Sequence, residues 1–313
     1  MKKILLTGVN GQVGHALHAL LEKTTLDQPF ELIGLTRHQL DLSRDDEIRR
    51  VIQEIKPSLI INPAAYTAVD RAESEPELAF AINAQAPKVM AEAAAQLNAS
   101  LIHFSTDYVY DGQKSSAYLE TDTVNPLSVY GKTKLAGEQA IAHIGLPHLI
   151  FRTSWVYGAY GKNFLKTILR LSAEHEKLRI VSDQYGSPTS SQSIAAATAQ
   201  LLLGWNRDEV AQTGVYHMTN SGSTSWHRFA CQIIREYEDQ IEHHHLPVLK
   251  ARVDYVEAIS TNDYPTPAVR PANSRLDNTK LKTVFNVELP LWQEALQDEL
   301  NTLMDATLAE KQK

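Results

Sequence analysis

Residues 3–14 read KILLTGVNGQVG, in which three glycines follow a short apolar run at intervals of three residues. Gly8, Gly11 and Gly14 allow the backbone to turn tightly and to approach a pyrophosphate, whose charge then lies at the N-terminus of the next helix. A glycine-rich turn between a strand and a helix can have the same spacing without any ligand. The loop therefore indicates a nucleotide site only together with its surroundings.

Those surroundings are an alternation of strand-like and helix-like segments. Amphipathic stretches such as 12–23 and 87–98 separate five short apolar runs, at 3–8, 31–35, 58–62, 100–106 and 148–153. This order predicts an α/β fold, a Rossmann-like doubly wound parallel sheet whose strands are buried on both faces. The rhythm loosens after about residue 155. We therefore expect a dinucleotide-binding domain at 1–155, with some later segments returning to it, and a smaller, mixed substrate domain at 156–313.

Composition excludes several classes of protein. The chain has 313 residues, 21% of them charged, and a net charge of −7, which argues against a general nucleic-acid binder. The single cysteine, Cys231, lies in a helical pattern and fits a buried structural thiol in a reducing compartment. No apolar run approaches the roughly 20 residues of a membrane span, and the start is too short for a signal peptide. We expect a cytoplasmic protein that contacts neither membrane nor nucleic acid.

The end of the second predicted strand bears on the choice of cofactor. An enzyme that prefers NAD usually has a carboxylate there to bind the ribose 2′-hydroxyl, whereas this chain has Thr36 and Arg37. A hydroxyl and a guanidinium suit a 2′-phosphate, so we predict NADPH; Arg37 could also simply face solvent, and NADH remains possible. Other residues are placed to border the adenine or to let the dinucleotide lie close: Asp41, Leu42, Ala64 and Ala65.

The segment PLSVYGKTKLAGE at 126–138 places Tyr130 and Lys134 four residues apart, on one face of a helix. A free tyrosine has a pKa near 10, and a lysine ammonium one turn away favours the phenolate and lowers that pKa. Lys134 could also hold the nicotinamide ribose. Thr106, at the end of the fourth predicted strand, would bring a hydroxyl to the same place. Tyr-x-x-x-Lys pairs also arise by chance, but behind a glycine loop this one predicts an acid/base centre.

Several longer motifs resemble a known family. The glycine loop, STDYVYDG (105–112) and YGKTK (130–134) are similar to the extended short-chain dehydrogenases/reductases. NPAAYTAVDRAESEP (62–76), FRTSWVYG (151–158), DQYGSPT (183–189) and YPTPAVRPANSRLD (264–277) resemble, more closely, the dTDP-4-dehydrorhamnose reductase family. The resemblance extends nearly from end to end of the chain.

The resemblance implies an activity and a set of site residues. The family reduces dTDP-4-dehydro-β-L-rhamnose at C4 with hydride from NADPH or NADH, the last step of dTDP-L-rhamnose synthesis. The resemblance implies that Tyr130 protonates the C4 alkoxide. It also implies that Lys134 depresses the pKa of Tyr130 and that Thr106 tunes the same tyrosine. Asp107 and Trp155 match sugar-contacting positions, although Trp155 could equally be plain core. Matching cofactor positions are Gln12, Val13, Thr36, Asp41, Leu42, Ala65, Tyr66 and Thr67.

Two departures from the family pattern matter. Pro63 stands where the family often has alanine, and it removes a backbone N–H at the end of a strand. Some members dimerise around a magnesium ion held by three glutamates, but the matching positions here are Ala16, Gln192 and Gln293. Magnesium prefers carboxylate oxygens, so we expect no bound metal and, as the simplest state, a monomer, with a homodimer as the alternative. The histidines at 243–245 read as an exposed turn, since adjacent imidazoles diverge.

Two rival functions remain at this stage. Another sugar-nucleotide reductase or epimerase would need a second acid/base pair, typically cysteine and histidine, and Cys231 lies far from the predicted centre. A non-catalytic regulatory subunit can use the same fold to bind a partner, as in methionine adenosyltransferase. Because Tyr130, Lys134 and Thr106 are all present, the sequence favours the reductase.

Overall fold

The computed structural model describes residues 2–26, 29–203, 212–244 and 246–311. Its centre is a six-stranded sheet in which every neighbouring pair is parallel. The strands, in spatial order, are β10 (Gly214–His217), β5 (His148–Thr153), β4 (Ser100–Thr106), β3 (Leu59–Asn62), β1 (Lys2–Thr7) and β2 (Phe30–Leu35). The predicted doubly wound α/β fold is confirmed.

The order of the strands reverses at β1. β2 pairs with one edge of β1, whereas β3, β4 and β5 follow one another from the other edge. In open parallel sheets, ligands bind outside the carboxyl ends of the strands where the order reverses. The sheet therefore directs a binding crevice to the ends of β1 and β3, which are the ends that carry the glycine loop and the segment from Pro63 onward.

Side chains of each central strand alternate between two apolar cores, as expected for strands covered on both faces. Ile4 and Leu6 of β1 pack in one core with α1 (Gln12–Leu21) and α8 (Ser191–Leu203). Leu5 packs in the other, with α2 (Asp45–Ile55), α5 (Ala86–Gln96) and α6 (Val129–Ile144). Between β3 and α5 lie α3 (Val69–Ala72), α4 (Pro76–Phe80) and the π-helix η1 (Ala81–Gln85).

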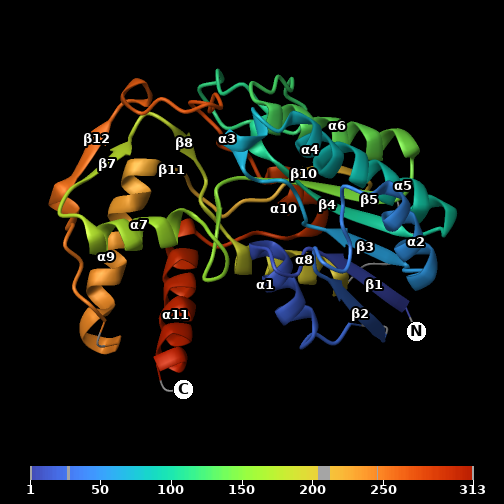
Figure 1. Ribbon diagram of the computed structural model, residues 1–313, viewed down its shortest axis with the longest axis horizontal. Helices are drawn as coiled ribbons and strands as arrows, with labels where there is room; N and C mark the ends of the chain where they lie inside the picture. Colours follow the sequence, from blue (N-terminus) through green and yellow to red (C-terminus); the bar gives the residue numbers. More distant parts are fainter. Residues whose placement is uncertain (1, 27–28, 204–211, 245, 312–313) are drawn as a thin grey trace.

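The second half of the chain contributes both to this sheet and to a separate layer (Figure 1). β10 extends the sheet and α8 packs on α1, so two later segments return to the first unit. A third core joins α7 (Phe164–Glu174), α9 (Trp226–His244) and α11 (Trp292–Lys311). The other strands are β6 (Val156–Tyr157), β7 (Leu178–Val181), β8 (Tyr185–Gly186), β9 (Thr189–Ser190), β11 (Thr224–Ser225) and β12 (Val256–Ile259). The other helices are α10 (Thr279–Phe285) and the 3₁₀-helices η2 (Asp107–Val109), η4 (Val253–Tyr255) and η5 (Thr261–Asp263). Among the described helices, none has the length and hydropathy to cross a membrane.

One ion pair lies inside the first unit. Arg152 of β5 makes a bidentate contact with Glu138 of α6, with Nη2 2.6 Å from Oε2, and both side chains are about 5% exposed or less. Arg152 also donates to the hydroxyl of Tyr110 (2.7 Å), and Ser105 donates to Glu138. Each charge is thus paired and hydrogen-bonded, which is the condition under which a buried ion pair is tolerated.

We expect Glu138→Ala to lower the free energy of unfolding by about 3–5 kcal/mol, because it leaves the Arg152 guanidinium buried without a counter-ion. The control is Glu54→Ala, which removes an exposed partner of Arg50 on α2 and should cost about 1 kcal/mol or less. Urea unfolding of the three proteins measures the difference. Equal losses of unfolding free energy in the two variants would contradict the role of Glu138 as the buried partner of Arg152.

Candidate active site

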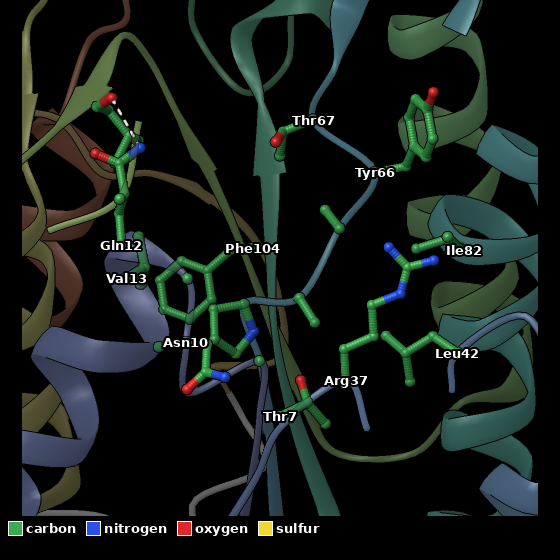
Figure 2. Close-up of a pocket in the computed structure, with 18 of the residues that line it drawn as sticks. Thr7, Asn10, Gln12, Val13, Arg37, Leu42, Tyr66, Thr67, Ile82 and Phe104 are labelled. Atoms are coloured by element: carbon green, nitrogen blue, oxygen red, sulfur yellow. Dashed lines mark hydrogen bonds between the residues drawn. The ribbon is translucent and has the colours of Figure 1, made fainter. Parts of the chain in front are cut away.

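A cavity of about 550 Å³ opens at the carboxyl ends of β1 to β5. Figure 2 shows Arg37, Leu42 and Ile82 on one side of it and Gln12, Val13 and Phe104 on the other. The cavity brings together every residue that the sequence suggested for the cofactor except Thr36: Gly8, Gly11, Gln12, Val13, Gly14, Arg37, Asp41, Leu42, Ala64, Ala65, Tyr66, Thr67, Tyr130 and Lys134. Residues that sequence reasoning did not single out also line it, among them Asn10, Ile82, Phe104, Thr153 and Lys162.

The glycine loop forms the floor between β1 and α1. Gly8 has φ +63°, and a Cβ added to Gly14 would lie 2.1 Å from the Gly8 carbonyl oxygen, so α1 starts in contact with the strand. Gly11 precedes the first turn of α1, and no side chain caps that turn. The first backbone N–H groups of a helix lack partners within the helix and suit a phosphate.

Two groups in the loops around the cavity are fixed by hydrogen bonds. Asp41 accepts from the backbone N–H (3.0 Å) and hydroxyl (2.8 Å) of Ser43, and these bonds lower the pKa of the Asp41 carboxyl. Thr36 follows the last residue of β2, and its N–H and hydroxyl both donate to the Gln39 side chain at 2.9 Å. Arg37 is exposed at the same strand end. The guanidinium is therefore available to an anion at this end of the cavity.

Asn83, in the π-helix η1, is a site residue that the sequence did not indicate. Its Oδ1 accepts from the N–H of Tyr66 (2.8 Å), and its Nδ2 donates to the Tyr66 carbonyl oxygen (3.1 Å). The side chain is fully buried and so pins the segment from Pro63 to Thr67 along the cavity. No signal in the sequence pointed to it, because the contact joins the π-helix to a loop 17 residues earlier in the chain, which only packing brings together.

Tyr130 and Lys134 lie on the first turns of α6, with Ser128 as the capping residue that accepts from the N–H of Gly131. Both side chains are buried, and both line the cavity. Lys134 Nζ lies 2.6 Å from the Phe104 carbonyl oxygen and 3.1 Å from His103 Nε2. Burial lowers the pKa of Lys134 to about 8, with an opposing contribution from the Glu138 carboxylate.

The expectation that Lys134 lowers the pKa of Tyr130 is not met in this arrangement. Burial raises the pKa of Tyr130 to about 12, and the opposing contribution comes from a hydrogen bond with Thr106. The physical reason is that the Lys134 ammonium is directed to the sheet, at Phe104 and His103, while desolvation penalises the phenolate. The phenol is accordingly held in its protonated form.

Thr106 connects Tyr130 to a buried carboxyl group. Its hydroxyl donates to Asp107 Oδ1 (2.9 Å) and accepts from the N–H of Tyr108 (3.2 Å). Ser154 donates to the other Asp107 oxygen at 2.9 Å. Burial raises the pKa of Asp107 to about 6, while hydrogen bonds from Ser274, Thr106 and Ser154 oppose that rise. The predicted residues Tyr130, Thr106 and Asp107 therefore lie in one chain of hydrogen bonds.

Trp155 lies at the junction with the second half of the chain. Its φ is +47°, an uncommon value for a bulky side chain. The ring stacks on Trp226 of α9 with centroids 3.5 Å apart and planes 8° apart. Gly186 lies against the indole, because an added Cβ would be 2.4 Å from Trp155 Cε2. Trp226 and Gly186 were not suggested by the sequence.

Comparison with known proteins identifies the family. The family model described as RmlD substrate binding domain matches residues 1–304. The chain belongs to this family. A Burkholderia thailandensis protein named dTDP-4-dehydrorhamnose reductase is 45% identical over 298 residues, which cover 94% of this chain and 96% of that protein. The family resemblance read from the motifs is thus confirmed.

Two solved structures of the same named enzyme superpose closely on this member of the family. A dTDP-4-dehydrorhamnose reductase from Clostridium acetobutylicum is 35% identical, with a TM-score of 0.85, and covers 96% of this chain and 99% of its own. One from Bacillus anthracis, described in complex with NADP, is 34% identical with a TM-score of 0.84, at 96% and 100% coverage. Both matches span nearly all of each chain.

The positions that the sequence resemblance matches to magnesium ligands are not arranged as a metal site. Ala16 and Gln192 line a second cavity of about 580 Å³, and Gln293 is exposed near the start of α11. Gln192 Nε2 instead donates to Glu299 Oε2 (3.2 Å) and to the Thr302 hydroxyl (2.9 Å). Across the part of the chain that the structure describes, no three His, Cys, Asp or Glu residues are grouped so as to hold a metal ion. The predicted turn at 243–245 is wrong for its first two residues, because the backbone of His243 and His244 continues α9. Their side chains and His245 lie outside the described residues.

Cys231 and a histidine do lie together, but on the far layer. Cys231 Sγ is 3.8 Å from His227 Nε2 within α9, and burial raises the pKa of the thiol. Neither residue lines the cavity that holds Tyr130 and Lys134. The pair therefore offers no second acid/base group to the reactive centre, which argues against the epimerase alternative.

Proposed function

We propose that this chain reduces dTDP-4-dehydro-β-L-rhamnose at C4 to dTDP-β-L-rhamnose with NADPH, or with NADH, in the last step of dTDP-L-rhamnose synthesis. The observation that carries the proposal is the placement of Tyr130 and Lys134 on one wall of a cavity at the carboxyl ends of β1 and β3. Membership of the family, with a relative named for this reaction that matches 94% of the chain, supports the choice of substrate. The assay is loss of NADPH absorbance when dTDP-4-dehydrorhamnose is added.

The cavity residues fit a dinucleotide. The uncapped start of α1 suits the pyrophosphate, and Arg37 suits a 2′-phosphate at the far end. Thr153 Oγ1 is buried at the end of β5, lines the cavity and has no hydrogen-bond partner among the described residues, so a bound group would satisfy it. The Bacillus anthracis relative is described with NADP. When bound, the cofactor would supply a hydride to C4 of the sugar.

The residues of this chain handle the proton. Tyr130, held neutral by burial, donates its hydroxyl proton to the oxygen at C4 as that oxygen gains charge. Thr106 hydrogen-bonds to the phenol, and its hydroxyl, once turned from Asp107, can donate to the phenolate oxygen that the proton transfer leaves. Lys134 has an ammonium hydrogen left for a ribose hydroxyl, since its other contacts are with Phe104 and His103.

We propose that Asp107 and Trp155, together with Thr106 and Tyr130, bind the sugar of the substrate. Asp107 is a buried carboxyl at the end of β4, and Trp155 presents an indole whose position Trp226 and Gly186 fix. We propose that residues 1–155 hold the dinucleotide and that residues 156–313 mainly bind the sugar nucleotide. From the second range, α8 and β10 return to the first unit. We also propose that the enzyme is a cytoplasmic monomer that works without a bound metal.

Tyr130→Phe retains the ring and removes the proton donor. General acid catalysis typically contributes 10²–10⁴-fold, so we expect kcat to fall by about that factor while the Kd for NADPH stays nearly unchanged. Tyr255→Phe, which changes an exposed ring in the short 3₁₀-helix Val253–Tyr255 of the second half, is the matched control. A Tyr130→Phe enzyme with half of the normal turnover would refute the assignment.

Arg37→Ala tests the cofactor preference. Loss of a charge-assisted hydrogen bond to the 2′-phosphate should weaken NADPH binding by about 10–100-fold, whereas NADH binding should hardly change. Arg170→Ala, at an exposed arginine on α7, controls for the loss of a positive charge. Titrations of both cofactors against the three proteins provide the comparison, and equal losses for NADPH and NADH would assign Arg37 another role.

Metal removal tests the proposed monomer. Because Ala16, Gln192 and Gln293 offer no carboxylate, magnesium should bind weakly if at all. We expect full turnover after treatment with EDTA and a mass by light scattering that does not respond to added magnesium. Restoration of activity by the metal, or conversion of monomer to dimer, would contradict both the metal-free site and the alignment of those positions.

A further inference from the structure

His103 is a polar residue in the middle of a fully buried strand. It lies in β4, its side chain is 0% exposed, and its strand neighbours Ile102 and Phe104 are apolar. It does not line the cavity. A buried imidazole costs free energy unless its ring nitrogens are paired, so its presence in this strand calls for a partner at each nitrogen.

Each ring nitrogen of His103 has a polar partner. Nε2 lies 3.1 Å from Lys134 Nζ, and Nδ1 lies 3.1 Å from the side-chain amide of Asn62, which is opposite His103 in the register of β3 and β4. The other end of that amide is 2.6 Å from the hydroxyl of Thr7, the residue that precedes Gly8. A line of buried polar groups therefore runs from the start of the glycine loop, across two strands, to Lys134.

The protonation of the ring follows from its surroundings. Burial, together with the positive charge of Lys134, lowers the pKa of His103 well below its usual value, so the imidazole is neutral and has one accepting nitrogen. An ammonium at Nε2 requires that nitrogen to accept, which places the proton on Nδ1. In the structure Asn62 presents Nδ2 to Nδ1, and its Oδ1 accepts from the Thr7 hydroxyl. A half-turn of the amide, which leaves its shape unchanged, brings the carbonyl oxygen to the Nδ1 proton and the NH₂ group to Thr7, whose hydroxyl can accept as well as donate.

We propose that His103 is a positioning residue of the reaction, whose Nε2 holds the Lys134 ammonium in place while Asn62 and Thr7 fix the imidazole tautomer. With Phe104 and His103 as acceptors, two of the three ammonium hydrogens are directed at the sheet. Among the described residues Nζ has no third partner, so the remaining hydrogen is left for the cavity. The inference rests on the proposed function, because it gives Lys134 the orientation that ribose binding needs.

Charged and titratable groups near Lys134 come from three elements. On α6, Glu138 favours the ammonium and Tyr130 lies one turn earlier. On β5, Arg152 is paired with Glu138. On and after β4 lie His103 itself and Asp107, which reaches Tyr130 through Thr106. Of these, His103 is the neutral acceptor within hydrogen-bonding distance of Nζ, so its removal should act on the charge of Lys134 directly.

A hydrogen bond accepted from the ammonium favours the charged form and raises the pKa of Lys134. Without it, the pKa of Lys134 falls below its value of about 8, and the lysine loses its charge at lower pH. The alkaline limb of the pH profile of kcat should therefore move to lower pH.

The experiment compares His103→Gln with His103→Asn. The longer amide can place an acceptor where Nε2 lies, whereas the shorter one reaches only the position of Nδ1. We expect His103→Gln to retain kcat within about threefold and to keep the wild-type alkaline limb. We expect His103→Asn to lose about 10–100-fold in kcat, with a nearly unchanged KM for the sugar nucleotide and an alkaline limb displaced by about one pH unit.

His148→Asn is the matched control, since it removes another buried imidazole from the neighbouring strand β5, one that bonds the Leu146 carbonyl oxygen. It should lose stability in thermal unfolding but keep kcat and the alkaline limb. If His103→Asn does not fold, His103→Leu removes the same acceptor with a side chain that suits an apolar strand. A folded Asn or Leu variant with the wild-type alkaline limb, or a Gln variant as impaired as Asn, would overturn the proposal.

A second readout separates this proposal from the proposed function. The affinity for NADPH, measured by nicotinamide fluorescence without any sugar, should weaken at high pH as Lys134 loses its charge. In His103→Asn the weakening should begin about one pH unit lower than in the wild type. If the wild type fails to reduce dTDP-4-dehydrorhamnose, the proposed function falls; if the fluorescence profiles of wild type and variant coincide, the role of His103 falls.

Discussion

The central constraint on this molecule is that its parallel sheet is buried on both faces. Each strand sends alternate side chains into two different apolar cores, so a polar side chain within the sheet must find a partner there or lie at a strand end. The buried polar residues of the sheet have such partners or lie at strand ends. Thr7, Asn62 and His103 form one paired line, and Glu138 with Arg152 forms another. The remaining reactive groups gather at the carboxyl ends, where the reversal of strand order opens the crevice.

The same burial sets the electrostatics of the reactive centre. It raises the pKa of Tyr130 to about 12 and that of Asp107 to about 6, and it lowers the pKa of Lys134 to about 8. All three shifts favour the uncharged form. A phenol that keeps its proton is suited to donate it as charge develops on a substrate oxygen, and the hydrogen bond with Thr106 then favours the phenolate. The negative charge on Tyr130 thus forms only as its proton is transferred.

The second half of the chain completes the site by contacts across long stretches of sequence. Arg270 pairs with Asp70 (2.7 Å), which ties the loop before α10 to the segment that follows β3. Gln12, in the glycine loop, accepts from Asn163 at 2.9 Å, so the dinucleotide loop is joined to the start of α7. Trp226 fixes Trp155 by stacking. These contacts hold the wall of the second layer against the crevice of the first.

The sequence by itself determined the sheet, the glycine loop and the Tyr130–Lys134 pair, because each depends on local periodicity or on residues a few positions apart. It also placed nearly all of the cavity lining, since strand ends of a parallel sheet meet at one edge. Only the tertiary structure decided that Lys134 is directed at His103 and Phe104 rather than lowering the pKa of Tyr130, because desolvation depends on what packs around a group. Likewise Asn83, Trp226 and Gly186 act through neighbours distant in sequence, and no local pattern encodes such contacts.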